Sequence, residues 1–94
     1  MAIVKPVPPH QHIREVIGAN IVSAREAAGL TTQEDLADAI GARREQISAW
    51  ERGRRQPSFP HLIAIADATG HSDDLGWFYN EHEDDDLTAA ASAP

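Results

Sequence analysis

Residues 32–53 contain two short helical patterns on either side of a single glycine, and this arrangement constrains the fold more than any other part of the 94-residue sequence. Helical spacing places the apolar residues of each pattern on one side, and these residues are Leu36, Ala37, Ile40, Ile47 and Trp50. Gly41 separates the patterns, and glycine readily takes the left-handed conformation that ends one helix and lets the chain begin another. Spacing alone leaves two interpretations open, an ordinary helical hairpin in a structural bundle and a helix-turn-helix.

The charges of the chain are unevenly distributed, and their positions bear on this choice. The formal net charge is -7, but residues 81–94 contain five acidic residues and no lysine or arginine. Residues 43–55 show the opposite balance, with five arginines against Glu45 and Glu51. Since exposed charges are screened over about 8 Å at physiological salt, the field at a surface depends on the nearest charges. The positive charge over residues 43–55 favours a nucleic-acid partner in spite of the acidic total.

The length and composition allow one small domain and exclude several classes of protein. A chain of 94 residues with 41% hydrophobic and 5% aromatic residues can support one helical core with tails. Without cysteine it has neither disulfides nor thiolate metal sites. No apolar run approaches the roughly 20 residues that span a bilayer, and prolines interrupt the N-terminal residues where a signal peptide would be apolar. We therefore expect a soluble, cytoplasmic protein without membrane association.

Capping residues and apolar periodicity predict an all-α chain in three parts. The parts are a flexible, proline-rich arm, a folded domain and an acidic, disordered tail, at residues 1–12, 13–80 and 81–94. Five helices are predicted, over residues 13–28, 33–40, 43–52, 59–69 and 75–80. Thr32 and Ser58 are suitable N-caps because their hydroxyl groups accept hydrogen bonds from free backbone N–H groups. Gly18 and Asn20 are expected to weaken the first helix slightly.

Three pieces of the sequence follow one another in a diagnostic order, at residues 33–37, 47–53 and 57–58. In order and spacing they resemble the phage-repressor and Cro-like helix-turn-helix family, also called the XRE family, and the resemblance covers residues 13–78. It implies a five-helix, lambda-repressor-like DNA-binding domain whose second and third helices form the helix-turn-helix. It further implies a sequence-specific transcriptional regulator of repressor or Cro type, binding a two-fold operator in double-stranded DNA as a homodimer. No enzyme activity, cofactor or small-molecule ligand is expected.

The resemblance places the third helix in the DNA major groove, so its outward residues are candidates for contacts with bases. With Ile47 and Trp50 pointing inward, the outward residues are Arg44, Glu45, Ser48 and Ala49. Arg44 can donate two hydrogen bonds to guanine, and Glu45 can accept one from cytosine. Ala49 offers only a methyl group, so base readout is expected to be thinner than is usual for the family.

The resemblance also implies phosphate contacts at the start of the second helix and around the third. The candidates are Gln33, Arg43, Gln46, Arg52, Gly53, Arg54 and Arg55. Free N–H groups at a helix N-terminus attract anions, and guanidinium groups bind phosphate oxygens through paired hydrogen bonds. Gln46 can serve either a base or a phosphate, and the sequence leaves that choice open. Arg43 stands where the family usually has a Ser or Thr cap, which costs the third helix about 0.5–2 kcal/mol.

Glu51 is expected on the inner side of the third helix, where an unpaired carboxylate would be costly. The resemblance implies an ion pair with Arg25 near the end of the first helix, which would hold the third helix against the scaffold. The alternative is a solvated Glu51 at a frayed helix end.

Two further groups of residues allow more specific interpretations. Trp77, Phe78 and Tyr79 cannot all face one side of a short helix, and they are a candidate dimer patch. The alternative is that Leu75 and Phe78 complete the core. The five histidines do not predict a metal site, because no pair has the i, i+4 spacing typical of zinc ligands.

The acidic tail has two interpretations. It is either a solvated end, or a segment that folds back onto the arginines or binds the basic surface of another protein. The second interpretation includes an alternative function, an antitoxin-like protein-binding module that uses its DNA domain for autoregulation. Leu87 is the one large apolar residue after Tyr79, and a tail with so few apolar anchors favours the plain regulator.

Overall fold

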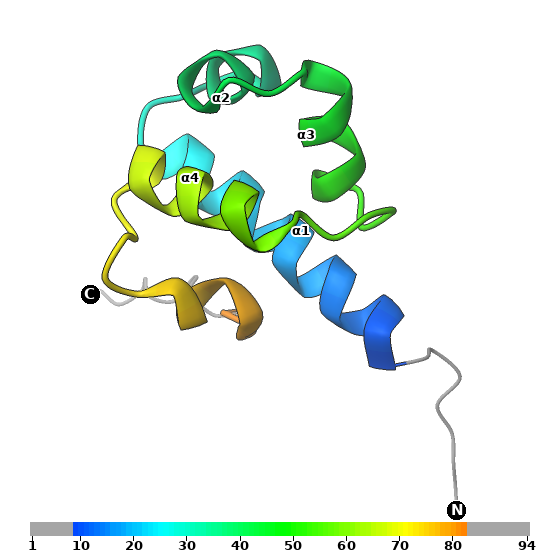
Figure 1. The fold of residues 1–94 in the computed structure, drawn as a ribbon. Helices are drawn as coiled ribbons and strands as arrows, with labels where there is room; N and C mark the ends of the chain where they lie inside the picture. The colour runs from blue at the N-terminus through cyan, green and yellow to red at the C-terminus, as the bar shows by residue number, and fades with distance from the viewer. Residues whose placement is uncertain (1–8, 83–94) are drawn as a thin grey trace, which may run out of the picture.

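The computed structural model describes residues 9–82 and consists there of four α-helices and one 3₁₀-helix, with no strand among these residues (Figure 1). The α-helices α1 to α4 comprise Pro9–Ala27, Gln33–Ile40, Arg44–Glu51 and Phe59–Thr69, and the 3₁₀-helix η1 comprises Leu75–Tyr79. The predicted all-α class is confirmed for this part of the chain, with η1 in place of the fifth α-helix. Most of the predicted arm and tail, residues 1–8 and 83–94, lies outside the described residues.

Helix α1 begins at Pro9 rather than at the expected Ile13. Proline is favourable in the first turn of a helix because the N–H group that it lacks would have no partner within the helix. The last of the prolines that suggested an extended arm is therefore the first residue of a helix. Residues 9–12, which the sequence assigned to the arm, are helical.

The two ends of α2 follow the expected capping pattern. The Thr32 hydroxyl accepts a hydrogen bond from the backbone N–H of Asp35 at 3.0 Å, and the Asp35 carboxylate accepts one from the backbone N–H of Thr32 at 3.1 Å. The second of these hydrogen bonds is the main cause that lowers the pKa of Asp35 below its usual value. Gly41 ends the helix with a φ of 73°, which a side chain would disfavour. Helix α2 therefore begins and ends where the sequence predicted.

The segment η1 is held against α1 by Asn20. Its backbone has the i to i+3 hydrogen bonds of a 3₁₀-helix, from Trp77 N to Asp74 O at 3.0 Å and from Asn80 N to Trp77 O at 3.3 Å. The buried side-chain amide of Asn20 donates to the carbonyl oxygens of Phe78 at 2.9 Å and Asn80 at 2.8 Å. Asn20 thus fixes η1 to α1 instead of merely weakening α1.

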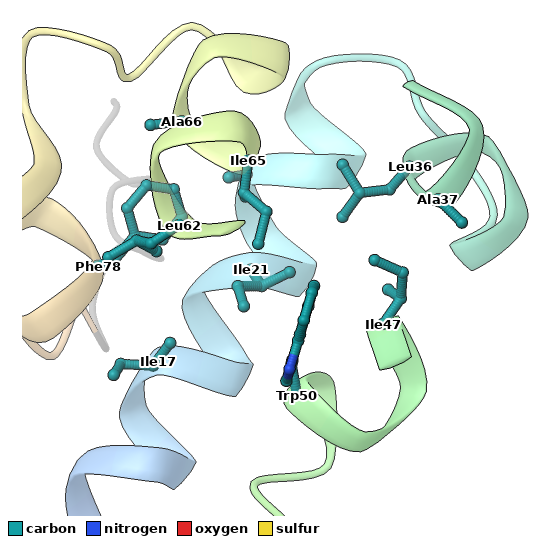
Figure 2. Close-up of a cluster of buried hydrophobic side chains, with 11 residues drawn as sticks. Ile17, Ile21, Leu36, Ala37, Ile47, Trp50, Leu62, Ile65, Ala66 and Phe78 are labelled. Atoms are coloured by element: carbon teal, nitrogen blue, oxygen red, sulfur yellow. The ribbon is translucent and has the colours of Figure 1, made fainter. Parts of the chain in front are cut away.

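The core is shared by all five elements (Figure 2). Helix α1 packs against α3, α4 and η1, and α2 packs against α3 and α4. The core residues are Ile17, Ile21 and Ala24 from α1, Leu36 and Ala37 from α2, Ile47 and Trp50 from α3, Leu62, Ile65 and Ala66 from α4, and Phe78 from η1. Figure 2 shows the Trp50 ring extending from α3 toward Ile21. Since α2 and α3 share this core, the angle between them is fixed by packing.

Candidate nucleic-acid interface

Helix α3 buries one side and exposes the other, as its apolar spacing indicated. Ile47 is fully buried and Trp50 is 4% exposed. Arg44 and Glu45 are exposed at the first turn, while Ser48 and Ala49 are half-buried along the flank. The structure therefore presents Arg44 and Glu45 most fully, and Ala49 lines, together with Glu45, a groove between α3 and the start of α4.

A buried ion pair joins the end of α3 to α1 and α2. Glu51 accepts hydrogen bonds from Arg25 Nε at 2.8 Å and from Gln33 Nε2 at 2.9 Å, and Arg25 Nη2 lies 3.4 Å from the same carboxylate. The side chains of Arg25 and Glu51 are only 8% and 5% exposed. Arg25 Nη1 also donates to the carbonyl oxygen of Leu30 at 3.0 Å. Glu51 is therefore buried and paired rather than solvated, and this network fixes the end of α3 to α1 and α2.

Gln33 has a structural role that the sequence did not indicate. The resemblance assigned its side chain to phosphate, whereas the structure places its amide nitrogen on the Glu51 carboxylate. An amide nitrogen carries two hydrogens, so one remains for a further acceptor. Gln33 thus links the start of α2 to the end of α3.

The approach of α1 to α3 requires a glycine at position 18. A Cβ atom built on Gly18 would lie 2.4 Å from the carbonyl oxygen of Trp50 and 2.7 Å from that of Glu51. Both distances are shorter than non-bonded contacts allow, and both involve backbone atoms that cannot rotate away. The residue that the sequence treated as a weak point of α1 therefore sets how close α3 lies to it.

Only one of the two hydrogen bonds of a capping box is present at the start of α3. Arg43 is the N-cap residue, and its side chain has no acceptor for the free N–H groups of the first turn. The side-chain oxygen of Gln46 accepts instead from the backbone N–H of Arg43 at 3.0 Å. Gln46, which the sequence left between base and phosphate, is thus tied to the helix start, and the Arg43 side chain is exposed.

The connection between α3 and α4 carries three exposed arginines on a fixed backbone. Arg52, Arg54 and Arg55 are exposed, whereas Gly53 between them is buried with a φ of 75°. A Cβ atom on Gly53 would lie 3.1 Å from Glu15 Cγ, so the connection lies directly on α1.

Arg14 of α1 holds this connection, a role that the sequence did not indicate. Its Nε donates to the carbonyl oxygen of Gly53 at 3.2 Å, and its Nη2 donates to the side-chain oxygen of Gln11. A lone arginine in a predicted helix gives no signal of such a distant contact.

The exposed charge of this face is more positive than the sequence count suggested. All five arginines at positions 43, 44, 52, 54 and 55 are exposed, whereas Glu51 is buried and neutralised by Arg25. Glu45 is the one acidic residue of residues 43–55 left on the surface. The arrangement can bind anionic oxygens along a polymer, because several guanidinium groups lie beside one exposed helix face.

The predicted dimer patch at residues 77–79 is wrong for Phe78, which is fully buried in the core. Trp77 is partly covered because it stacks between the rings of His71, at 4.2 Å, and His82, at 4.5 Å between centroids. Tyr79 alone is exposed, at 41%. A five-residue 3₁₀-helix turns one of its three consecutive aromatic side chains into the core, which is the alternative that the sequence had left open.

The described residues contain no cluster of three or more metal-ligating side chains. Among the same residues, no helix is both long enough and apolar enough to cross a membrane.

Comparisons with known proteins agree with this arrangement. A helix-turn-helix family profile matches residues 21–75, which is more than half of the chain. An uncharacterized HTH-type transcriptional regulator, y4dJ, of Sinorhizobium fredii (strain NBRC 101917 / NGR234) is 37% identical over 60 residues, covering 64% of this chain and 77% of that protein. No solved structure gives a significant match.

Proposed function

Since the chain belongs to the XRE-type helix-turn-helix family and is a DNA-binding transcriptional regulator, we propose that it is a repressor of Cro type that recognises a two-fold operator through the major groove. Helix α3 enters the groove and α2 lies above it against the DNA backbone, which is the usual docking of this motif. Such a repressor acts by occupying its operator and excluding polymerase.

The observation that carries the proposal is the division of α3 into a locked face and a charged face. Ile47 and Trp50 fix one side in the core, and Glu51 is held by Arg25 and Gln33. The side that carries Arg44 and Glu45 is exposed, and the exposed arginines of the connection follow α3 in the chain. A helix held this rigidly can present side chains to base edges without a large loss of conformational freedom on binding.

The side chains that contact bases lie on the first turn and the flank of α3. Arg44 is suited to the O6 and N7 atoms of guanine, Glu45 to the amino group of cytosine, and Ser48 to several bases. Ala49 lies in the groove beside α4 and adds at most a methyl contact to thymine. Because so few side chains read bases, a single copy discriminates weakly, and a homodimer on two half-sites supplies the missing specificity.

Phosphate contacts belong to the residues around this reading surface. Arg52, Arg54 and Arg55 hold one DNA strand together with the backbone of Gly53, and Arg43 adds a contact at the start of α3. Gln33 reaches a phosphate with its second amide hydrogen while the first stays on Glu51. Gln46 stabilises the helix start and contacts DNA only through its amide nitrogen. Neutralising about three to five phosphates per copy gives a log–log salt slope of about -3 to -4.5.

Selection of bound sequences from a random DNA pool at two salt concentrations tests the proposal. The Arg44→Ala variant is expected to change which sequences are enriched, with a loss of about 1–3 kcal/mol of discrimination at one base pair. The Arg54→Ala variant is expected to weaken binding to all sequences alike and to reduce the magnitude of the salt slope by about 1. These two variants are matched, since each removes one exposed arginine. Failure to enrich any motif at either salt concentration would contradict sequence-specific binding.

A further inference from the structure

Helix α4 has an apolar face that no described part of the chain covers. Its inner side contributes Leu62, Ile65 and Ala66 to the core. On the outer side, Phe59 is 62% exposed and Ile63 is 38% exposed. These two residues are one helical turn apart, so their side chains are neighbours on the surface. Figure 1 shows α4 in front of α1, with α2, α3 and η1 around it.

This face differs from isolated exposed side chains elsewhere on the domain. Phe59, Ile63 and Tyr79 are the exposed large hydrophobic residues of the described chain, and two of the three lie together on α4 with the exposed Pro60 between them. The aromatic residues of η1 do not offer a comparable surface, since Phe78 is buried and Trp77 is stacked between two histidines.

We propose that a second copy of this chain docks on the outer face of α4, with the two α4 helices antiparallel across a two-fold axis between Phe59 and Ile63. In this arrangement Phe59 of one copy lies against Ile63 of the other, and the same contact occurs twice, as an isologous interface requires. We call the surface made by Phe59, Pro60 and Ile63 the α4 patch.

The charges at the two ends of α4 make this face complementary to itself. The start of the helix is positive, because Arg54 and Arg55 precede it and its first N–H groups carry a partial positive charge. The same outer side ends at the exposed Asp67, one turn beyond Ile63. Antiparallel pairing brings the positive end of each helix to the Asp67 end of the other. Parallel pairing would place like charges together, so the charges favour the antiparallel arrangement.

The size of the α4 patch sets how strongly the copies associate. A stable dimer buries about 800 Å² on each partner, and three partly exposed side chains supply only a fraction of that area. The copies therefore pair only weakly without DNA, and they pair firmly when DNA holds two of them on neighbouring half-sites. The patch begins directly after the arginine connection, so it lies beside the DNA-facing side. This inference rests on the proposed operator-binding function and identifies the contact between the two copies.

The test compares the full-length chain with its Phe59→Gln and Tyr79→Gln variants. Glutamine is uncharged and tolerated in helices, so the phosphate-binding surface keeps its charge. Each protein is titrated with a duplex that carries one selected half-site and with a duplex that carries two in two-fold arrangement. We expect the native chain and Tyr79→Gln to bind the double site cooperatively. Phe59→Gln is expected to lose about 10-fold or more in affinity for the double site and less than about 2-fold for the single site.

A second variant tests the charge argument with the same two duplexes. Asp67→Asn is expected to weaken binding to the double site by about 1.5-fold to 5-fold, with a smaller effect at high salt, and to leave the single site unchanged. Asp73→Asn, which removes an exposed carboxylate beyond the end of α4, is the matched control and is expected to change neither.

The outcomes separate this inference from the proposed function. Cooperative binding by Phe59→Gln, or non-cooperative binding by the native chain, overturns the α4 contact while leaving operator binding intact. An equal loss on single and double sites also overturns it, since Phe59 would then contact DNA. Failure to select any half-site contradicts the proposed function itself. Sedimentation of the native chain and Phe59→Gln at high protein concentration then tests the contact without DNA, and identical association by the two proteins overturns it.

Discussion

A single buried carboxylate, Glu51, connects three elements of the domain. It accepts hydrogen bonds from Arg25 of α1 and Gln33 of α2 while belonging to the last turn of α3. A buried ion pair adds little net stability compared with a well-packed apolar pair, but removing one partner leaves a charge without compensation. The pair therefore positions the end of α3 relative to α1 and α2, and its loss would affect the helix that we propose contacts bases.

Replacing Arg25 by alanine is expected to lower the free energy of unfolding by about 3–5 kcal/mol, because the Glu51 carboxylate would remain buried with only Gln33 as a donor. Urea denaturation measures this change. Arg44→Ala removes an exposed arginine and is expected to shift the unfolding free energy by no more than about 0.5 kcal/mol. Arg25→Lys keeps the charge but loses the paired geometry, so its loss should fall between the two. Equal stabilities of Arg25→Ala and Arg44→Ala would refute the role of the pair.

At the scale of elements, the contact of α1 with α3 depends on the absence of a side chain. Gly18 lets the backbone of α1 approach the carbonyl oxygens of Trp50 and Glu51, at the end of α3. A glycine within a helix costs about 1 kcal/mol relative to alanine. The close approach is the reason that this cost is tolerated here.

Gly18→Ala is expected to destabilise the domain by about 1–3 kcal/mol in spite of the better helix propensity of alanine, because either α3 or α1 must shift. A displaced α3 should also weaken binding to a selected operator. Thermal unfolding and an operator titration measure the two effects. Gly76→Ala is the control, since a Cβ atom there meets no other atom within 4 Å. A Gly18→Ala protein that is more stable than the native chain would show that the helices accommodate the methyl group.

The limits of prediction from the sequence are clearest at this scale. Thr32, Gly41 and the spacing of α2 and α3 were predictable because caps and periodicity are local. Helix α4 was predictable as a helix, but its apolar residues go round more than one side, so periodicity did not indicate that Phe59 and Ile63 are exposed. The contacts of Arg14 and Asn20 join residues far apart in the chain, and no local pattern encodes them.

Over the whole molecule, the chain closes its core with η1. Phe78 is fully buried among residues from the other helices, and the Asn20 amide donates to the carbonyl oxygens of Phe78 and Asn80. The side chains of His12, near the start of α1, and Glu81, after η1, form a hydrogen bond at 2.6 Å, so the two ends of the described chain meet. Displacing η1 would therefore expose the core on the side of the domain that lies opposite α2 (Figure 1).

Phe78→Ala is expected to lower the free energy of unfolding by about 3–5 kcal/mol, because it leaves a cavity in the core. Tyr79→Ala is expected to cost less than about 1 kcal/mol, since that side chain is largely outside the core. Chemical denaturation of both variants distinguishes a core residue from a surface residue. Similar losses for the two would mean that η1 does not close the core in the way described.

The close approach of Gly53 to α1 affects the rate of DNA binding and its cost in conformational entropy. Fixing the backbone of one residue costs about 1–2 kcal/mol of conformational entropy, and flexible arginine-bearing loops usually incur it when they bind. Here Arg14 and the contact with Glu15 have already ordered the connection during folding. In the proposed complex the backbone that carries the three arginines is therefore already ordered, so their charge can guide encounter with DNA without a rearrangement of that backbone.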